Sequence, residues 1–176
     1  MSSSSVPTFP ELLGSAVESA VHLEMRDVYA VDSETGPFAR WREGFRHDPA
    51  DRASWWRPWL DLIEETVGRG VVVRRARIVS EPVSEYIRYE HSGTFTNVAA
   101  GELIRWLPRR QASGLALPGN DFWLIDGHLI RWNHFTGEGA SAGGEVSTDP
   151  AAAKLCGEAF EAVWERGIPH EQYEIR

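Results

Sequence analysis

The sequence predicts one α/β domain in which a mixed sheet is flanked by helices. Segments with the two-residue period of strands alternate along the chain with segments of helical period, which favours layers of helices on a sheet. Apolar residues make up 42% of the 176 residues, and a chain of this length can bury one sizeable core. No linker-like stretch divides the chain, so we expect a flexible tail over residues 1–9 and a single domain over residues 10–176.

The first third of the chain predicts a helix, a strand and a loop. Pro10 suits the first turn of a short helix, which we expect to extend to Ala20. Residues 21–26 alternate apolar and polar side chains, as a half-buried strand does. Residues 32–53 are polar and punctuated by glycine and proline, so we expect a long loop there.

The middle of the chain predicts a helix, two strands and a second helix between them. Apolar residues recur at helical spacing from Trp59 to Val67, directly after Pro58, and indicate a helix. Residues 71–79 are rich in β-branched side chains and predict a strand. Ser80 is expected to cap the helix that follows, and residues 104–107 predict a short strand.

The last third predicts a hairpin and a closing helix. Residues 122–125 form an apolar run, and Asp126-Gly127 is a tight-turn signal, so residues 129–135 should return beside them. Residues 137–144 are small and polar and are expected to form a mobile loop. Residues 151–166 predict the final helix, because an Asp-Pro pair precedes them and a glycine follows.

The composition argues against several functional classes. The formal net charge is −8, with 26 acidic and 18 basic side chains, and this repulsion disfavours a direct grip on nucleic acid. Cys156 is the only cysteine, which excludes an internal disulfide. The N-terminus has no basic start followed by an apolar segment, and no apolar run approaches the length of a membrane span. We therefore expect a cytoplasmic protein without a membrane partner.

No cofactor or metal is expected from the motifs. The sequence lacks the Gly-Lys-Ser/Thr phosphate loop, the Gly-x-Ser-x-Gly elbow and the dinucleotide glycine fingerprint. His128 and His134 share one strand face, but six residues of strand separate them by about 20 Å. One ion cannot reach both.

The segment Asp121-Phe122-Trp123-Leu124-Ile125-Asp126-Gly127 resembles the strand and turn of the phospholipase D motif, which reads His, one residue, Lys, four residues, Asp. Gly70–Arg74 is similar to the helix-to-strand step upstream in that superfamily, and Phe160–Glu165 is similar to its closing helix. The resemblance implies a phospholipase-D-like half-domain.

The chain departs from that motif at its reactive positions. Gly119 stands where the family has its nucleophilic His, and Asp121 stands where it has Lys. The family's chemistry needs an imidazole to attack phosphorus and a cation to stabilise oxyanions. Neither residue can replace them, so we expect no phosphodiesterase catalysis. Asp126 alone carries over, as a turn residue.

The whole chain also resembles an uncharacterised actinobacterial family whose members are often encoded beside helix-turn-helix regulators. The resembling pieces are Leu23–Tyr29, Arg75–Ser80, Ala100–Glu102 and Asp121–Asp126. This resemblance implies no established activity. It implies work alongside a helix-turn-helix regulator or another basic protein, to which an acidic surface would suit docking.

A polar cluster is the strongest candidate for a binding site. Arg75 and Arg77 share one face of their predicted strand, because alternate residues point the same way. Glu24 lies on another predicted strand and can pair with either of them if the two strands are neighbours. Such arginines could bind a small polar or anionic ligand, and a structural ion-pair network is the competing interpretation. The candidate ligand-binding residues are Glu24, Arg26, Tyr29, Arg75, Arg77, Glu102, Arg105, Asp121, Trp123 and His134.

Three functions remain open from the sequence. The first is a non-catalytic ligand- or protein-binding regulatory module that acts with a helix-turn-helix regulator. The alternative is an enzyme with an atypical site built around Glu24, Arg75, Arg77 and Glu102. The third is a purely structural interaction protein, and the sequence also leaves a homodimer open.

Overall fold

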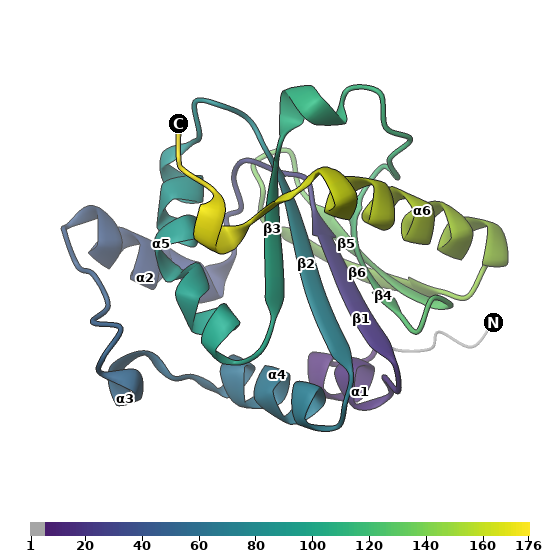
Figure 1. Cartoon of the computed structure of the whole chain (residues 1–176), viewed down its shortest axis with the longest axis horizontal. Coiled ribbons are helices and arrows are strands. Elements are labelled where there is room, and N and C mark those ends of the chain that lie inside the picture. Colours follow the sequence, from purple (N-terminus) through teal and green to yellow (C-terminus); the bar gives the residue numbers. More distant parts are fainter. Residues whose placement is uncertain (1–5) are drawn as a thin grey trace.

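The computed structural model describes residues 6–176; residues 1–5, the start of the expected tail, lie outside the described residues. A seven-stranded mixed sheet in the order β6-β5-β4-β1-β2-β3-β7 forms the centre, and helices lie on both of its faces (Figure 1). Strands β1, β2 and β3 are parallel, and the other four run antiparallel to their neighbours. The expected α/β fold with a mixed sheet is confirmed.

The strands are β1 (Ser19–Glu24), β2 (Val72–Val79), β3 (Leu103–Pro108), β4 (Asp121–Ile125), β5 (Leu129–Phe135), β6 (Ser141–Ser147) and β7 (Ile168–Pro169). The α-helices are α1 (Phe9–Gly14), α2 (Asp32–Arg42), α3 (Arg52–Trp55), α4 (Pro58–Gly68), α5 (Glu85–Ala99) and α6 (Pro150–Arg166). Residues 6–176 also form two short 3₁₀ helices, η1 (Arg109–Ala112) and η2 (His170–Gln172).

The first helix is shorter than the sequence predicts. A capping box between Thr8 and Glu11 starts α1 at Phe9, and the helix ends at Gly14. Ser19 and Ala20, expected in that helix, instead pair with β2. Phe9, a residue of the expected tail, packs against the apolar cluster under α1 and α4.

Three further expectations about local structure are wrong. The long loop expected over residues 32–53 contains α2 and the start of α3. Ser84, not Ser80, caps α5, because its hydroxyl accepts a hydrogen bond from Ile87 N. The mobile loop expected over residues 137–144 contains the start of β6, which pairs with β5.

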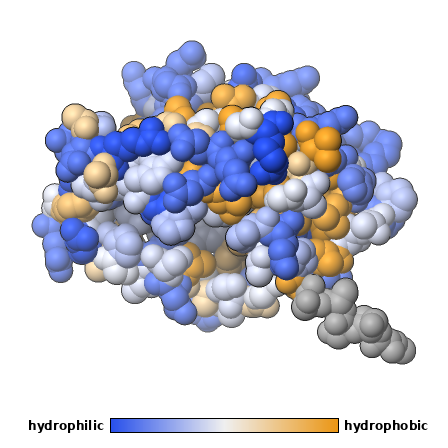
Figure 2. Space-filling view, turned by 90° about the horizontal axis from the view of Figure 1, so that it is seen from below, coloured by the Kyte–Doolittle hydropathy of each residue, from blue (hydrophilic) through white to orange (hydrophobic). Residues whose placement is uncertain are grey.

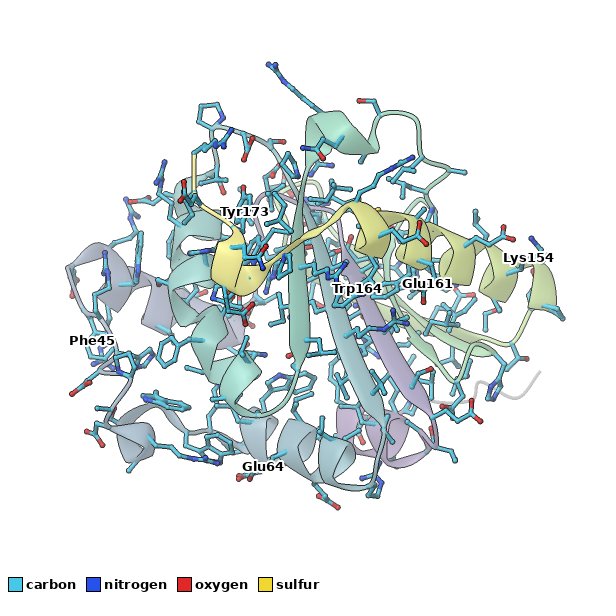
Figure 3. All side chains as sticks on the ribbon, viewed as in Figure 1. Phe45, Glu64, Lys154, Glu161, Trp164 and Tyr173 are labelled. Atoms are coloured by element: carbon cyan, nitrogen blue, oxygen red, sulfur yellow. The ribbon has the colours of Figure 1, made fainter. Side chains whose placement is uncertain are left out.

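Three apolar clusters hold the layers together. Helix α6 covers one face of the sheet, where Phe160 packs with Leu23 and Phe122. On that side Arg74 pairs with Glu161 at 2.6 Å and lies over the ring of Trp164 (Figure 3). The remaining buried apolar residues lie on the opposite face, under α1 and α4 and under α5.

The C-terminal segment closes one end of the α5 layer. Tyr173 stacks on Trp106 of β3 with ring centroids 5.5 Å apart (Figure 3). Val83 N donates to the carbonyl oxygen of Arg176, so the last residues pair with the approach to α5. Because α1, α4 and α5 cover only parts of their face of the sheet, its central residues are left to line a cavity.

Candidate functional site

Polar side chains, together with the indole of Trp123, form two rows across the face of the sheet that α1, α4 and α5 partly cover. The first row follows the pairing of neighbouring strands and contains Arg131, Trp123, His22 and Arg75. The second row lies two residues away along each strand and contains Asn133, Asp121, Glu24 and Arg77. Each residue lies two positions from its counterpart in the other row, so the pleat directs both rows to the same face.

Glu24 joins the two arginines of β2, as the sequence predicted. Its Oε1 accepts from Arg75 Nη1 at 2.9 Å, and its Oε2 lies 2.6 Å from Arg77 Nη1. Arg75 also donates to Glu102 at 2.7 Å, and Arg77 donates to Glu90 at 2.5 Å. All of these groups except the partly buried Glu90 are buried, and each arginine has two carboxylate partners.

The pKa of Glu24 reflects this pairing. Burial alone would raise the pKa of its carboxyl, but Arg77 and Arg75 outweigh burial and lower the pKa to about 2. Glu24 is therefore ionised throughout the neutral range. Together with Glu102 and Glu90, these side chains form a paired floor that leaves neither arginine free for a ligand.

A cavity of about 970 Å³ lies over the two rows. Its walls come from α1, from α5, and from the segment that runs through α2 and α3 to the start of α4. That segment lies on the outer side of α5 in Figure 1, and Phe45 marks its outer part in Figure 3. The molecule seen from below shows a recess near its middle (Figure 2), and Trp56 and Trp59 line the cavity from the α4 side.

Four arginines that line the cavity, Arg40, Arg46, Arg57 and Arg131, have no carboxylate within salt-bridge distance among the described residues. Arg40 and Arg46 are exposed, in α2 and just after it. Arg131 bonds to Asn133, and its guanidinium carbon lies 4.3 Å from the centre of the Phe9 ring. Its buried Nε has no hydrogen-bond partner. Arg57, at the entrance to α4, donates only to the neutral side chains of Thr96 and Asn97. Burial lowers the pKa of Arg131, as expected for a cation without a counter-ion.

His22 is a neutral polar group in the middle of the cavity floor. Burial, together with the nearby arginines, lowers the pKa of its imidazole to about 3. The ring stacks on Trp123 with centroids 4.4 Å apart. Its Nδ1 lies 3.5 Å from Glu24 Oε1 and makes no hydrogen bond. The imidazole is therefore neutral, and its Nδ1 is a buried polar atom without a partner.

Two tyrosine–carboxyl pairs also line the cavity. Tyr29 donates its hydroxyl to Asp121, and Tyr86 donates its hydroxyl to Glu34 on α2. The two rings are 5.9 Å apart. Burial raises the pKa of Glu34 to about 7, with a further contribution from Glu90. Burial likewise raises the pKa of Asp121 to about 6.

The structure brings most of the sequence-predicted site residues to one place. The cavity is lined by Glu24, Tyr29, Arg75, Arg77, Asp121, Trp123 and His134. Glu102 is buried directly behind Arg75 and orients it. The predicted grouping therefore includes eight of the ten candidates, while their role as ligand-binding residues stays a prediction.

Arg26 and Arg105 do not join the group. Strand β1 ends at Glu24, so the alternation does not carry Arg26 onto the same face; it donates to the carbonyl oxygen of Thr136 instead. Arg105 is in register with Ala76, which packs on the α6 side. Its guanidinium donates to the carbonyl oxygen of Trp164, on the opposite face of the sheet.

Several cavity residues were missed by sequence reasoning. Arg131 and Asn133 alternate on the predicted return strand of the hairpin, and that spacing is a signal that could have identified them. Glu34 lies in a segment expected to be a loop. Its position follows from how α2 packs on α5, which no local pattern in the sequence reports.

The positions that resemble the phospholipase D motif have structural partners here. Asp121 accepts hydrogen bonds from Met25 N and from Tyr29. Asp126 has a positive φ of 47°, and its carboxylate accepts from three successive backbone amides, those of residues 17, 18 and 19. It ties the β4–β5 turn to the start of β1, which is a turn role.

Two further classes of site were sought across residues 6–176. In that range no group of three His, Cys, Asp or Glu side chains is placed to hold a metal ion. None of the helices formed by the same residues is long and apolar enough to cross a membrane.

Comparison with solved structures shows what this fold is similar to. Nuc, a phospholipase D family member from Salmonella typhimurium, superposes with a TM-score of 0.53 at 11% identity, over 91% of this chain and 86% of that one. TrmBL2, an archaeal chromatin protein described as showing a novel mode of DNA binding, gives a TM-score of 0.48 at 12% identity, over 90% of this chain and 47% of that one. The likeness to Nuc shows a phospholipase-D-like fold and nothing about activity.

Comparison of sequences gives the family. No curated protein matches the chain. A model of a domain of unknown function, DUF6879, matches residues 7–175. Since this match spans nearly the whole chain, the protein belongs to the DUF6879 family.

Proposed function

We propose that this domain is a non-catalytic binding module that takes a small anionic molecule into the cavity over its sheet. The observation that carries the proposal is Arg131, a half-buried cation whose Nε has no partner and for which the described residues supply no carboxylate. A desolvated charge without a counter-ion is costly. A carboxylate or phosphate on a ligand would supply that counter-ion, and guanidinium geometry suits both.

The walls indicate what the rest of the ligand is. Phe9, Trp59 and Trp123 pack edge to face around the Arg131 end, with ring centroids 5.5 to 6.1 Å apart. Aromatic surfaces favour a planar or apolar skeleton, while a few polar groups orient it. The expected ligand therefore carries its anionic group on such a skeleton.

The proposal is tested by titration calorimetry with 4-methylbenzoate and phenyl phosphate as probes. Arg131→Gln should weaken binding of the better probe by about tenfold or more, because a hydrogen bond to a charged group contributes about 1.5–3 kcal/mol. Arg52→Gln is the matched control, since Arg52 is exposed and pairs with Glu64. No saturable binding to the wild type, or equal binding by the Arg131 variant, would contradict the proposal.

The enzymatic alternative built on Glu24, Arg75, Arg77 and Glu102 has less support. Each of these side chains is already held by an ionic partner. The low pKa of Glu24 makes it a poor general base near neutral pH. The paired network suits a fixed floor better than a reacting group.

We also propose, as the regulatory part of this function, that the domain docks on a helix-turn-helix regulator and does not itself grip DNA. The support is the net charge of −8 and the resemblance to an actinobacterial family encoded beside such regulators. Affinity purification from the native host should recover the regulator, and a gel shift at physiological salt should show no sequence-specific binding by the isolated domain. Sub-micromolar specific DNA binding would overturn this part.

A further inference from the structure

The part of the cavity lined by Tyr29, Tyr86 and α2 has an excess of carboxyl groups. Glu24, Glu34, Glu90 and Asp121 all line the cavity. Arg77 pairs with Glu24 and Glu90, and no cation among residues 6–176 lies within salt-bridge distance of Glu34 or Asp121. Their only side-chain partners are the neutral hydroxyls of tyrosines.

Aromatic rings surround these two carboxyl groups. The ring of Tyr29 lies 5.9 Å from that of Tyr86 and 5.0 Å from that of Phe135. Tyr89 and Trp41 continue the wall along α5 and α2, with ring centroids 6.1 Å apart. Aromatic faces beside carboxylates attract an ammonium group, because the ring quadrupole and the anions act in the same direction.

The raised pKa values agree with a missing cation. Burial raises the pKa of Glu34 to about 7 and that of Asp121 to about 6, so both are partly protonated near neutral pH. A cation placed between them would favour their ionised forms and release protons. His22, which is only 8% exposed, lies next to Trp123 on the same floor, and its buried Nδ1 has no hydrogen-bond partner.

The strand register sets how far apart Arg131 and Asp121 lie. Arg131 is opposite Trp123, and Asp121 is two residues further along the same strand, opposite Asn133. Arg131 and Asp121 are therefore a diagonal cross-strand pair, whose Cα atoms are about 7–8 Å apart. Because strand side chains stand roughly perpendicular to the sheet, a compact ligand can contact both residues.

We infer that the ligand is amphoteric, with an anionic group held at Arg131 and an ammonium group held at Glu34 and Asp121, on one compact skeleton. This inference rests on the proposed function, since it adds a second anchoring end to the same cavity. It assigns Glu34 and Asp121 as the residues that select an amine.

Three probes on one skeleton test the inference by titration calorimetry: 4-(aminomethyl)benzoate, 4-methylbenzoate and 4-methylbenzylamine. The amphoteric probe should bind the wild type about tenfold more tightly than 4-methylbenzoate, because it adds a charged hydrogen bond at the second end. At pH 6.5, titrations in buffers of different ionisation enthalpy should show proton release with the amphoteric probe and none with 4-methylbenzoate.

Glu34→Gln should reduce the preference for the amphoteric probe over 4-methylbenzoate to near one, because the glutamine keeps an acceptor for Tyr86 but removes the charge. Asp32→Asn is the matched control on the same turn of α2 and should keep the preference; Asp32 is exposed and does not line the cavity. Equal binding of the two carboxylate probes to the wild type, without proton release, would overturn the inference and leave the proposed function standing. If neither carboxylate probe binds, the proposed function itself fails.

Discussion

Glu24 bridges two buried arginines at the centre of the cavity floor. Its two oxygens reach Arg75 and Arg77 on the neighbouring strand. Glu102 and Glu90 hold the far sides of the same arginines. The floor is therefore a connected network, in which removing one carboxylate leaves two guanidinium groups partly uncompensated in a buried site.

Glu24→Gln should destabilise the protein by about 3–5 kcal/mol, the usual cost of removing one partner from a buried ion pair. Urea denaturation followed by tryptophan fluorescence measures it. Glu161→Gln is the control, because Glu161 is more than half exposed in its pair with Arg74 and should cost no more than about 1 kcal/mol. Equal effects of the two variants would show that the buried network does not hold the fold.

The same carboxyl group predicts a pH dependence. The pKa of Glu24 is about 2 in the folded protein, below its ordinary value of 4.5, so its contribution to stability is complete above pH 4.5 and is lost as the pH falls toward 2. The difference in unfolding free energy between wild type and Glu24→Gln should shrink across that window. A difference that stays constant from pH 6 to pH 2.5 would contradict the low pKa.

The pairing of Glu24 with the β2 arginines could be predicted from sequence, because strand alternation and neighbouring strands suffice for it. The partners on helices could not be predicted in the same way. Glu90 reaches Arg77 from α5, and Glu34 reaches Tyr86 from α2. Those contacts depend on how each helix crosses the sheet, which the local spacing of residues does not encode.

Helix α2 is held to the domain more weakly than the other elements that form the cavity. None of its residues is buried, and it contains Pro37 and Gly36. Its attachments to α5 are the bond between Glu34 and Tyr86, the packing of Phe38 and Trp41 on tyrosine rings, and the pair formed by Arg42. This explains why its sequence resembles a loop: it has no apolar stripe to bury.

The docking of α2 should weaken as the pH rises. Burial raises the pKa of Glu34 from 4.5 to about 7, so its contribution to stability is present below pH 4.5 and is lost as the pH rises through 7. Hydrogen exchange of residues 32–42, corrected for the intrinsic rate, should show less protection at pH 8 than at pH 5.5. Glu34→Gln should remove this dependence, and an unchanged dependence in that variant would assign it to another group.

Strand β6 was missed because its two glycines make it resemble a loop. Gly144 is required by a close approach, since a Cβ there would lie 2.9 Å from the carbonyl oxygen of Trp132 and 3.2 Å from Arg131 Cζ. The absence of a side chain lets β6 pair with β5 directly beside Arg131. From composition alone, such glycines indicate a flexible loop, whereas here Gly144 allows two strands to pack closely.

Gly144→Ala should therefore destabilise the protein by about 1–3 kcal/mol, the usual cost of overpacking, and should weaken 4-methylbenzoate binding by displacing Arg131. Gly157→Ala is the control: its Cβ would meet only Leu124, at 3.7 Å, and it lies on α6, on the other face. Chemical denaturation and calorimetry measure the two effects. Unchanged stability and affinity in the Gly144 variant would show that β6 shifts to accommodate the methyl group without moving Arg131.

At the scale of the whole molecule, the chain has a phospholipase-D-like fold but has Gly119 and Asp121 where the motif has His and Lys. The resemblance of a single strand and turn led to the right fold, because element order agreed along most of the chain. The cavity could not be predicted at that level. It exists because α1, α4 and α5 leave the centre of one sheet face uncovered, and only the packed structure shows this gap.

We expect no phosphodiesterase activity, because Gly119 and Asp121 provide neither the nucleophile nor the cation that the chemistry needs. Hydrolysis of bis(p-nitrophenyl) phosphate and of nucleic acid by the purified protein should stay at the level of a buffer blank. Turnover that persists in Asp121→Ala and Asp126→Ala would show this expectation to be wrong and would place the chemistry elsewhere.

The central claim is that Arg131 is the anchor of an anion-binding cavity, and NMR titration of the ¹⁵N-labelled protein tests it most directly. On addition of 4-methylbenzoate, the Nε–H signals of Arg131 and of the Trp123 indole should shift and saturate together, while the indole signal of Trp164, on the α6 side of the sheet, should not move. In Arg131→Gln the Trp123 shift should be lost at the same probe concentration. Shifts that spare Arg131 and Trp123, or that persist unchanged in the variant, would contradict the account.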